Sequence, residues 1–393
     1  MKKILLPSST FFWENNSEGL LYDYLSGKSI RFQIDTPEVS SLCRQWENLD
    51  NLYAARFDEE SATTKLEKLV HEIVEIGLGQ IHETDEPVIA FPPILCIDQG
   101  PEKATFWRDG LKSQPLLPYL SKICCFLGGK GQKIEWWRPI PPISSLEHRL
   151  DPARLFAFLS RTSKQLLSSL ELILFEWDDN QMASLIPALA GYKNCIHFFF
   201  THPDPGFYNE ILDKLVVDGF SITQVCPVDV DIRKASWVSG RSYQLLVKSE
   251  EDMNHWEELL QDAGDVDYDI KPVADNNLEF FRKNVFLSEE EILSQKLTKK
   301  DIFRHQALNV NQFGTFYVFP DGTVHPAADA PAVGTLEDSV HQMIIRELEE
   351  NHAWRQTRRL MEPCKNCLYH DLCPSPSVYE RIFGVPGCTY WKE

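Results

Sequence analysis

The sequence predicts an α/β fold with a partial (β/α) barrel, preceded by a small α+β module and followed by a cysteine-rich domain. Between residues 88 and 249, apolar runs typical of strands alternate with amphipathic, helix-like segments. Such alternation indicates a parallel sheet covered by helices on its outer face. The predicted strands are 88–97, 123–129, 170–177, 195–202, 222–230 and 243–249, and the predicted helices are 151–162, 181–192, 209–220 and 251–263.

These six strands are fewer than the eight of a complete barrel, so we expect a partial barrel over residues 86–285. A doubly wound sheet is the alternative. A chain of 393 residues has room for two or three domains, and we place the other two at residues 1–85 and 286–393.

The first domain shows strand and hairpin signals. Phe11–Trp13 is a strand candidate, and two further apolar runs meet at Ser26-Gly27-Lys28, where glycine favours a tight turn. The second run, residues 30–34, alternates apolar with polar side chains, which predicts one buried face and one exposed face.

Two helices are expected after this hairpin. Residues 35–38, Asp-Thr-Pro-Glu, combine a cap, a proline and an acid in the pattern of a helix start. A second helix over residues 61–76 carries Leu66, Leu69 and Val70 on one apolar stripe and ends at Gly77.

The last domain begins with a charged helix over residues 288–300. A hairpin with its turn at residues 320–322, Pro-Asp-Gly, follows, and then a helix over about 337–360. Arg355, Arg358 and Arg359 end this segment. They either complement the helix C-terminus or offset negative charge on a metal centre.

Four cysteines are concentrated near the end of the chain: Cys364, Cys367, Cys373 and Cys388, spaced C-x2-C-x5-C-x14-C. Close spacing of this kind holds thiolates around one metal ion or cluster, either tetrahedral zinc or iron–sulfur. A mixed site with nearby histidines such as His325 or His370 is the weaker alternative. The other six cysteines are expected to be buried, reduced thiols: Cys43, Cys96, Cys124, Cys125, Cys195 and Cys226.

The chain opens MKKILLPSSTFFW, without an apolar run of signal-peptide or membrane-span length. We therefore expect a cytoplasmic protein, in whose reducing environment clustered cysteines favour metal ligation over disulfides. The formal charge is −19, and residues 1–85 alone carry −7. Such acidity argues against nucleic acid as a partner, because phosphate contacts need Lys and Arg.

A partial barrel followed by a C-x2-C-x5-C tail resembles the radical SAM enzymes that carry a SPASM extension. In that family a C-x3-C-x2-C triplet after the first barrel strand holds the catalytic cluster, and no such triplet occurs in this chain. The family's Gly-Gly-Glu, which binds the amino group of S-adenosylmethionine, corresponds to Gly128-Gly129-Lys130. A lysine there would repel the ammonium group. The resemblance thus implies a vestigial cosubstrate site and no S-adenosylmethionine.

The SPASM-like domain also departs from its family. Ala327 and Ser377 stand where ligands of the first auxiliary cluster would be, whereas the four tail cysteines match the complete ligand set of the second. The resemblance therefore implies one [4Fe–4S] cluster in a structural or electron-storing role, with zinc as the alternative.

The first domain looks like the winged-helix, PqqD-like recognition element of ribosomal peptide (RiPP) maturation systems. Such elements bind a leader peptide as an added strand beside their third strand and a helix. The alternatives are a DNA-binding winged helix or a simple cap on the barrel. The matching positions here are Ile30, Arg31, Phe32, Gln33, Ile34, Leu66, Leu69 and Val70.

Together the three parts resemble the pseudo-radical-SAM proteins of GG-Bacteroidales-type peptide maturation. This resemblance implies a non-catalytic accessory protein, whose partners are a precursor leader peptide and a separate, active radical SAM maturase. The competing hypothesis is an iron–sulfur redox enzyme or electron-transfer protein without S-adenosylmethionine chemistry. Neither a P-loop nor a G-x-S-x-G or H-E-x-x-H motif points to another enzyme class.

Overall fold

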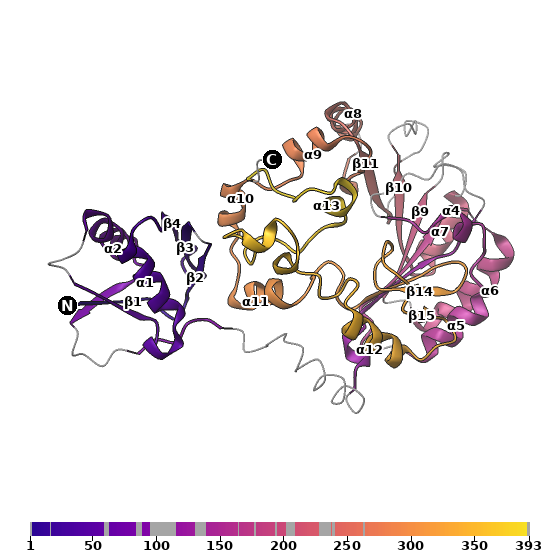
Figure 1. Cartoon of the computed structure of the whole chain (residues 1–393). Coiled ribbons are helices and arrows are strands. Elements are labelled where there is room, and N and C mark those ends of the chain that lie inside the picture. Colours follow the sequence, from indigo (N-terminus) through magenta and orange to yellow (C-terminus); the bar gives the residue numbers. More distant parts are fainter. Residues whose placement is uncertain are drawn as a thin grey trace.

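The computed structural model of the chain contains two small antiparallel sheets and one large mixed sheet among the residues it describes (Figure 1). The described residues are 2–15, 17–58, 63–83, 89–94, 115–129, 139–163, 165–176, 178–192, 195–201, 209–227, 237, 240–261 and 264–390.

The first domain contains both strands and helices, and the β3–β4 hairpin turns at Gly27 with a φ of +70°. Thr36 caps α1 by accepting from the Val39 N–H, and Gly77 ends α2 with a φ of +87°. The elements are β1 (Lys2–Leu5), β2 (Thr10–Glu14), β3 (Glu18–Asp23), β4 (Ser29–Gln33), α1 (Pro37–Glu47), β5 (Ala54–Phe57), α2 (Thr64–Ile76) and β6 (Gln80–Glu83).

The strand content of this domain differs from the three strands that were predicted. Strands β2, β3 and β4 form one sheet, while β1 lies between β5 and β6 in a second. The strands of this second sheet have only four residues each, and their partners are distant in the chain, so no local pattern marks them.

The large sheet is parallel over seven strands, in the order β12-β11-β10-β9-β8-β7-β13, and antiparallel at β14 and β15. Its strands are β7 (Lys122–Phe126), β8 (Ser169–Leu174), β9 (Ile196–Thr201), β10 (Ser221–Cys226), β11 (Ser242–Val247), β12 (Asp267–Pro272), β13 (Thr315–Val318), β14 (Thr323–His325) and β15 (Gly334–Thr335).

Helices follow the strands as predicted, and aspartate caps start two of them. Asp151 accepts from the Ala153 N–H before α5, and Asp178 accepts from the Gln181 N–H before α6. The helices are α4 (Ile143–Leu146), α5 (Pro152–Ser160), α6 (Asp179–Leu189), α7 (Asn209–Val217) and α8 (Glu250–Gln261).

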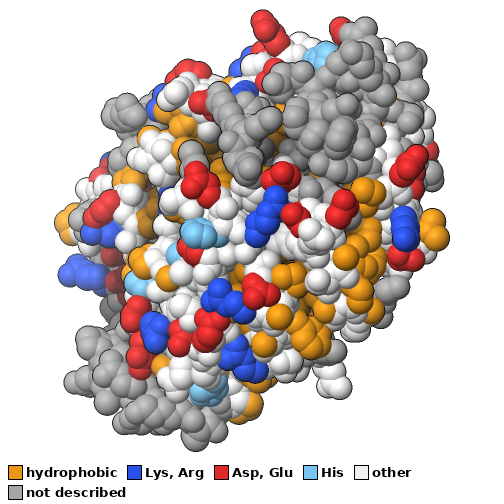
Figure 2. Space-filling model, turned by 90° about the vertical axis from the view of Figure 1, so that its right-hand side faces the viewer, with side chains coloured by type: hydrophobic (Ala, Val, Ile, Leu, Met, Phe, Trp, Pro, Cys, Tyr) orange, Lys and Arg blue, Asp and Glu red, His pale blue; other side chains and the backbone are white. Residues whose placement is uncertain are grey.

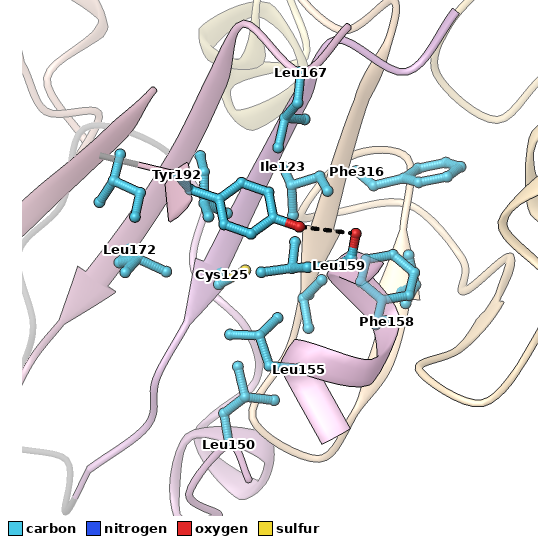
Figure 3. Packing of buried hydrophobic residues seen from close by; sticks show 14 of the residues in the cluster. Ile123, Cys125, Leu150, Leu155, Phe158, Leu159, Leu167, Leu172, Tyr192 and Phe316 are labelled. Atoms are coloured by element: carbon cyan, nitrogen blue, oxygen red, sulfur yellow. Dashed lines mark hydrogen bonds between the residues drawn. The ribbon is translucent and has the colours of Figure 1, made fainter. Parts of the chain in front are cut away.

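These helices bury one face of the sheet. Ile123 and Cys125 of β7 lie in the same core as Leu155 and Phe158 of α5 (Figure 3). In this core the Tyr192 hydroxyl donates to the carbonyl of Leu159 over 3.1 Å, which satisfies a polar group among apolar side chains (Figure 3).

The other face carries the alternate side chains of the same strands. Cys124 and Phe126 of β7 pack there with Phe199, Val225 and Tyr317, and no described helix contributes to this cluster. Helices α5, α6 and α7 thus lie against one face, whereas a doubly wound sheet carries helices on both faces.

One predicted strand is not observed among the described residues, and the large sheet has strands outside the predicted barrel. The described part of the predicted strand 88–97, residues 89–94, is irregular, and its other residues lie outside the described chain. Pro92 and Pro93 lack the N–H groups that a central strand needs. Strand β13 instead lies beside β7, so the large sheet continues past the predicted domain boundary at residue 285.

The last part of the chain also differs from the predicted helices. The expected helix at 288–300 is two helices, because Thr298 and Asp301 form a capping box that starts α11. The expected helix at 337–360 ends at Glu350, where Asn351 adopts a φ of +55°. The helices are α9 (Leu278–Asn284), α10 (Glu289–Ser294), α11 (Lys299–Ala307), α12 (Val340–Glu350) and α13 (Val378–Phe383).

The face seen in Figure 2 mixes acidic, basic and apolar side chains. Lys and Arg side chains there are interspersed with Asp and Glu, so they form no continuous basic area on the described part of this face. Among the described residues, no helix is both long enough and apolar enough to cross a lipid bilayer.

Candidate functional site

The four tail cysteines lie on short turns near the C-terminus. Cys364 begins a 3₁₀ turn that ends at Asn366, and Cys367 follows it directly. Cys373 follows the loop 368–372, and Cys388 lies beside Leu287 in an isolated parallel bridge. Cys364 and Cys373 are buried, with 8% and 7% of their surface exposed, whereas Cys367 and Cys388 are partly exposed.

The thiols influence one another's ionisation. Burial, with added repulsion from Cys364 and Cys388, raises the pKa of Cys367 to about 11. Burial also raises the pKa of Cys373, and the other three cysteines contribute in the same direction. Thiols coupled in this way lie in one neighbourhood, and a bound cation would favour their thiolate forms.

Two donors are directed at the sulfurs. Arg358 Nη1 lies 3.5 Å from Cys364 Sγ, and the backbone N–H of Tyr369 donates to Cys367 Sγ over 3.5 Å. Within the described chain, however, no group of three or more His, Cys, Asp or Glu side chains is close enough to hold a metal ion. The four thiols are suitable donors for a thiolate-bound metal. That they surround one metal centre stays a prediction.

The three arginines divide between the two predicted roles. Arg355 Nη1 donates to the Leu348 carbonyl near the end of α12, which complements the helix C-terminus. Arg358 pairs with Glu380 and contacts Cys364, and Arg359 pairs with Asp371. Only Arg358 therefore lies against a tail thiol in these contacts.

The two nearby histidines have other partners. The ring nitrogens of His325 hydrogen-bond to Thr323 Oγ1 and to the Ala330 carbonyl. His370 Nδ1 hydrogen-bonds to the Cys367 carbonyl. These contacts do not support a mixed His/Cys site.

The predicted peptide-binding strand is β4, the edge of its sheet. Among described residues it pairs with β3 alone. The Asp23 N–H donates to the Lys28 carbonyl, and the Ile34 N–H donates to the Ser17 carbonyl. Because hydrogen-bonded pairs alternate along an antiparallel ladder, the backbone groups of Ser29, Arg31 and Gln33 point away from β3.

Of the side chains predicted to bind the peptide, the polar ones are exposed and the apolar ones are buried or partly buried. Arg31 and Gln33 are exposed, and both hydrogen-bond to Glu18. The predicted apolar contacts lie in the domain core instead, so they are not free to meet a peptide in this conformation. The buried residues are Ile30, Phe32, Leu66, Leu69 and Val70, and Ile34 is partly buried.

Helix α2 runs alongside β4. Lys28 Nζ donates to the Ile76 carbonyl at the C-terminal end of α2, over 2.8 Å. Lys65 in the first turn of α2 pairs with Asp35 just after β4. These two contacts connect the strand and the helix at both ends, in antiparallel orientation.

The glycine pair of the predicted vestigial site makes a close turn. Gly128 has a φ of +85°, and a Cβ atom there would meet the His148 carbonyl oxygen at 1.9 Å. A Cβ atom on Gly129 would meet Glu176, which pairs with Arg149. Packing alone thus requires both glycines, and Lys130 lies outside the described residues.

A polar row on the sheet face opposite α5, α6 and α7 was missed. Lys122 pairs with Glu171 over 2.6 Å, and His197 and Thr223 approach to 2.5 Å. Thr223 also hydrogen-bonds Ser242 over 2.6 Å, at the edge of a cavity of about 810 Å³ lined by His197 and Ser242. The sequence feature that could have predicted this row is a polar residue near the start of each successive strand from β7 to β11.

No family model matches the chain, and no curated protein matches it. Among solved structures, it shows a likeness to the crystal structure of Streptococcus suis SuiB bound to precursor peptide SuiA. The two share 10% identical residues at a TM-score of 0.42, with 98% of each chain covered. At so low a TM-score, this likeness supports no conclusion about function.

Proposed function

We propose that the chain is a non-catalytic accessory protein of ribosomal peptide maturation. It binds the leader peptide of a precursor at the β4 edge and presents the precursor to a separate, active radical SAM maturase. The observation that carries this proposal is the row of outward-facing backbone groups at Ser29, Arg31 and Gln33, next to α2. An added peptide strand would satisfy these groups and gain affinity from backbone hydrogen bonds.

The proposal of a non-catalytic role rests on the sequence and on the glycine turn. The chain has no C-x3-C-x2-C triplet to hold a catalytic cluster. Gly128 and Gly129 are accounted for by close packing against His148 and Glu176, without a bound cosubstrate.

The proposed cofactor is one [4Fe–4S] cluster held by Cys364, Cys367, Cys373 and Cys388, with zinc as the alternative. Four thiolates complete the ligand set of such a cluster, so substrate finds no open iron position. A structural or electron-storing role follows from this full ligation.

The second candidate function is an iron–sulfur redox or electron-transfer protein, favoured by the same cysteines. Incubating the reconstituted protein alone with S-adenosylmethionine and a reductant tests for radical chemistry in either case. We expect that the protein neither binds nor cleaves S-adenosylmethionine. Detection of 5′-deoxyadenosine would overturn the non-catalytic assignment.

Peptide binding is tested with the full-length chain and the leader peptide of the precursor encoded beside it. We expect a Kd of about 1 μM, or about −8 kcal/mol, for an added strand. Arg31→Pro removes an outward backbone donor but also removes the contacts of Arg31 with Glu18 and Glu289. Arg31→Ala is the matched control, because it removes the same side-chain contacts and keeps the donor.

Binding should weaken about ten-fold or more in Arg31→Pro relative to Arg31→Ala, because a backbone hydrogen bond and the strand geometry are both lost. Circular dichroism checks that both variants are folded. Equal affinities would exclude the β4 edge as the binding site. If the precursor binds only the maturase, and this chain adds nothing, the presenter role is wrong.

A further inference from the structure

We infer that the first domain docks on the loop between Cys367 and Cys373, so that metal binding at the four cysteines determines the position of the β4 edge. The role of the β4 edge in binding a leader peptide rests on the proposed function. The coupling itself is carried by contacts between the first domain and residues 368–372.

The first contact is a buried hydrogen bond between distant parts of the chain. Trp13 Nε1, in β2, donates to Asp371 Oδ2 over 2.8 Å. The Asp371 side chain is fully buried, and Trp13 is 8% exposed. Asp371 belongs to the loop that joins two predicted ligands, so this bond connects the first domain directly to the metal-binding loop.

Asp371 is held from two further directions. Arg359 Nε donates to its Oδ1 over 2.7 Å, and Gln306 Nε2 donates to its Oδ2 over 2.9 Å. A buried carboxylate that loses a donor is destabilised, because water cannot replace the missing partner. The loop and Trp13 therefore stabilise each other's positions.

A second bridge starts from the β4 edge. Arg31 Nη1 lies 3.3 Å from Glu289 Oε1, the same oxygen to which the Tyr369 hydroxyl donates. The Arg31 guanidinium also lies over the Tyr390 ring, 5.2 Å from its centroid. Tyr369, like Asp371, lies between Cys367 and Cys373, so the proposed peptide edge and the cysteine loop share Glu289.

Apolar packing covers the space between these two bridges. Phe11, Leu20 and Tyr22 from β2 and β3 lie in one cluster with Leu368, Leu372 and Cys373. Cys373 is thus both a predicted ligand and a part of the interface. A change in its position on metal binding or release must alter the packing of the first domain.

These contacts imply a linkage. If metal binding orders the loop 368–372, and that loop holds the first domain, then docking must in turn strengthen metal binding, because coupling between two equilibria is reciprocal. Loss of the metal would release the first domain and the β4 edge from their positions.

The experiment uses full-length protein prepared without oxygen, with its iron or zinc quantified. Trp13→Phe keeps an aromatic ring and removes the donor to Asp371. Trp46→Phe is the matched control: Trp46 lies in the core of the same domain, and its Nε1 has no hydrogen-bond partner among described residues. Small-angle X-ray scattering reports domain docking, and a chromogenic chelator reports the rate of metal loss.

Stripping the wild-type protein of metal should increase its radius of gyration and raise hydrogen exchange in β2 and β3. Trp13→Phe should lose metal about ten-fold faster than Trp46→Phe, within the range of typical coupling between sites. Identical scattering before and after stripping, or equal metal loss in the two variants, would refute the coupling. Absence of bound iron and zinc in the wild-type protein would refute it as well.

Leader-peptide binding separates this inference from the proposed function. If docking follows metal content but the leader peptide does not bind, the coupling stands and the presenter role is wrong. If the leader peptide binds but the radius of gyration does not change when metal is removed, the presenter role stands and the coupling is wrong.

Discussion

Arg358 and Glu380 form a buried ion pair beside the cysteine site. Nη1 of the arginine lies 2.7 Å from Oε1 of the glutamate, and their side chains are 7% and 1% exposed. The glutamate also accepts from the backbone N–H groups of Ser377 and Gly387, each over 2.7 Å. This one carboxylate therefore holds the start of α13 and the segment that leads to Cys388.

Glu380→Gln should destabilise the protein strongly. It leaves the Arg358 charge buried without its counter-ion, and breaking a buried pair from one side costs about 3–5 kcal/mol. Urea unfolding measures the change. Glu279→Gln is the control, because Glu279 is 85% exposed in its pair with Arg282, and such a pair contributes about 0–1 kcal/mol. Similar losses in the two variants would contradict the role assigned to Glu380.

Gly128→Ala should be more harmful than Gly219→Ala. Both glycines have nearly the same backbone, with φ of +85° and +86°. A Cβ atom on Gly219 meets nothing within 4 Å, whereas one on Gly128 meets the His148 carbonyl oxygen. We expect Gly219→Ala to cost about 1–2 kcal/mol from backbone strain alone. Gly128→Ala should cost several kcal/mol more in the same unfolding measurement, and equal costs would show that the turn at Gly128 relaxes freely.

His197 should make stability depend on pH. Burial lowers its pKa below the ordinary value, with Lys122 acting in the same direction and Glu171 opposing it. The unfolded chain then binds a proton more readily than the folded chain, so stability is lost as pH falls below about 6.5. Unfolding at pH 7 and pH 5 should show a smaller loss in His197→Gln than in the wild-type protein.

The control for this titration is His71→Gln, because the His71 side chain is 80% exposed. It should show the wild-type loss of stability between the two pH values. If His197→Gln shows that same loss, the buried histidine is not the titrating group.

Anaerobically prepared protein should hold about one [4Fe–4S] cluster per chain. Cys364→Ala should lower the iron content and loosen mainly the residues after 300, because metal binding is coupled to local folding. Cys226→Ala is the control, because this buried cysteine belongs to the large sheet. Stoichiometric zinc without iron would replace the cluster by the alternative metal.

Local chemistry made part of the fold predictable. The caps at Thr36 and Asp178 start helices because a side-chain oxygen meets backbone N–H groups only a few residues away. Such signals need no knowledge of distant residues. The β3–β4 hairpin and the Pro320–Gly322 turn were predictable for the same reason.

Pairing between distant segments was not predictable in this way. Strand β12 reads DYDIKP, and its exposed edge position needs few apolar residues, so it was missed. The tail spacing predicts a metal site at the four cysteines, but nothing in the sequence shows that Trp13 meets Asp371. The buried partners of a site depend on tertiary packing, which leaves no mark on local spacing.

The position of β13 late in the chain, far from its neighbour β7, has a consequence for biosynthesis. Cys124 of β7 pairs with Glu171 on one side and with Tyr317 on the other, so β7 gains its second neighbour only after most of the chain has been translated. Until then one edge of an apolar parallel sheet has unpaired backbone groups, which attract other strands. A chain terminated prematurely before Thr315 would keep that edge permanently and would accumulate as aggregates rather than as a smaller folded protein.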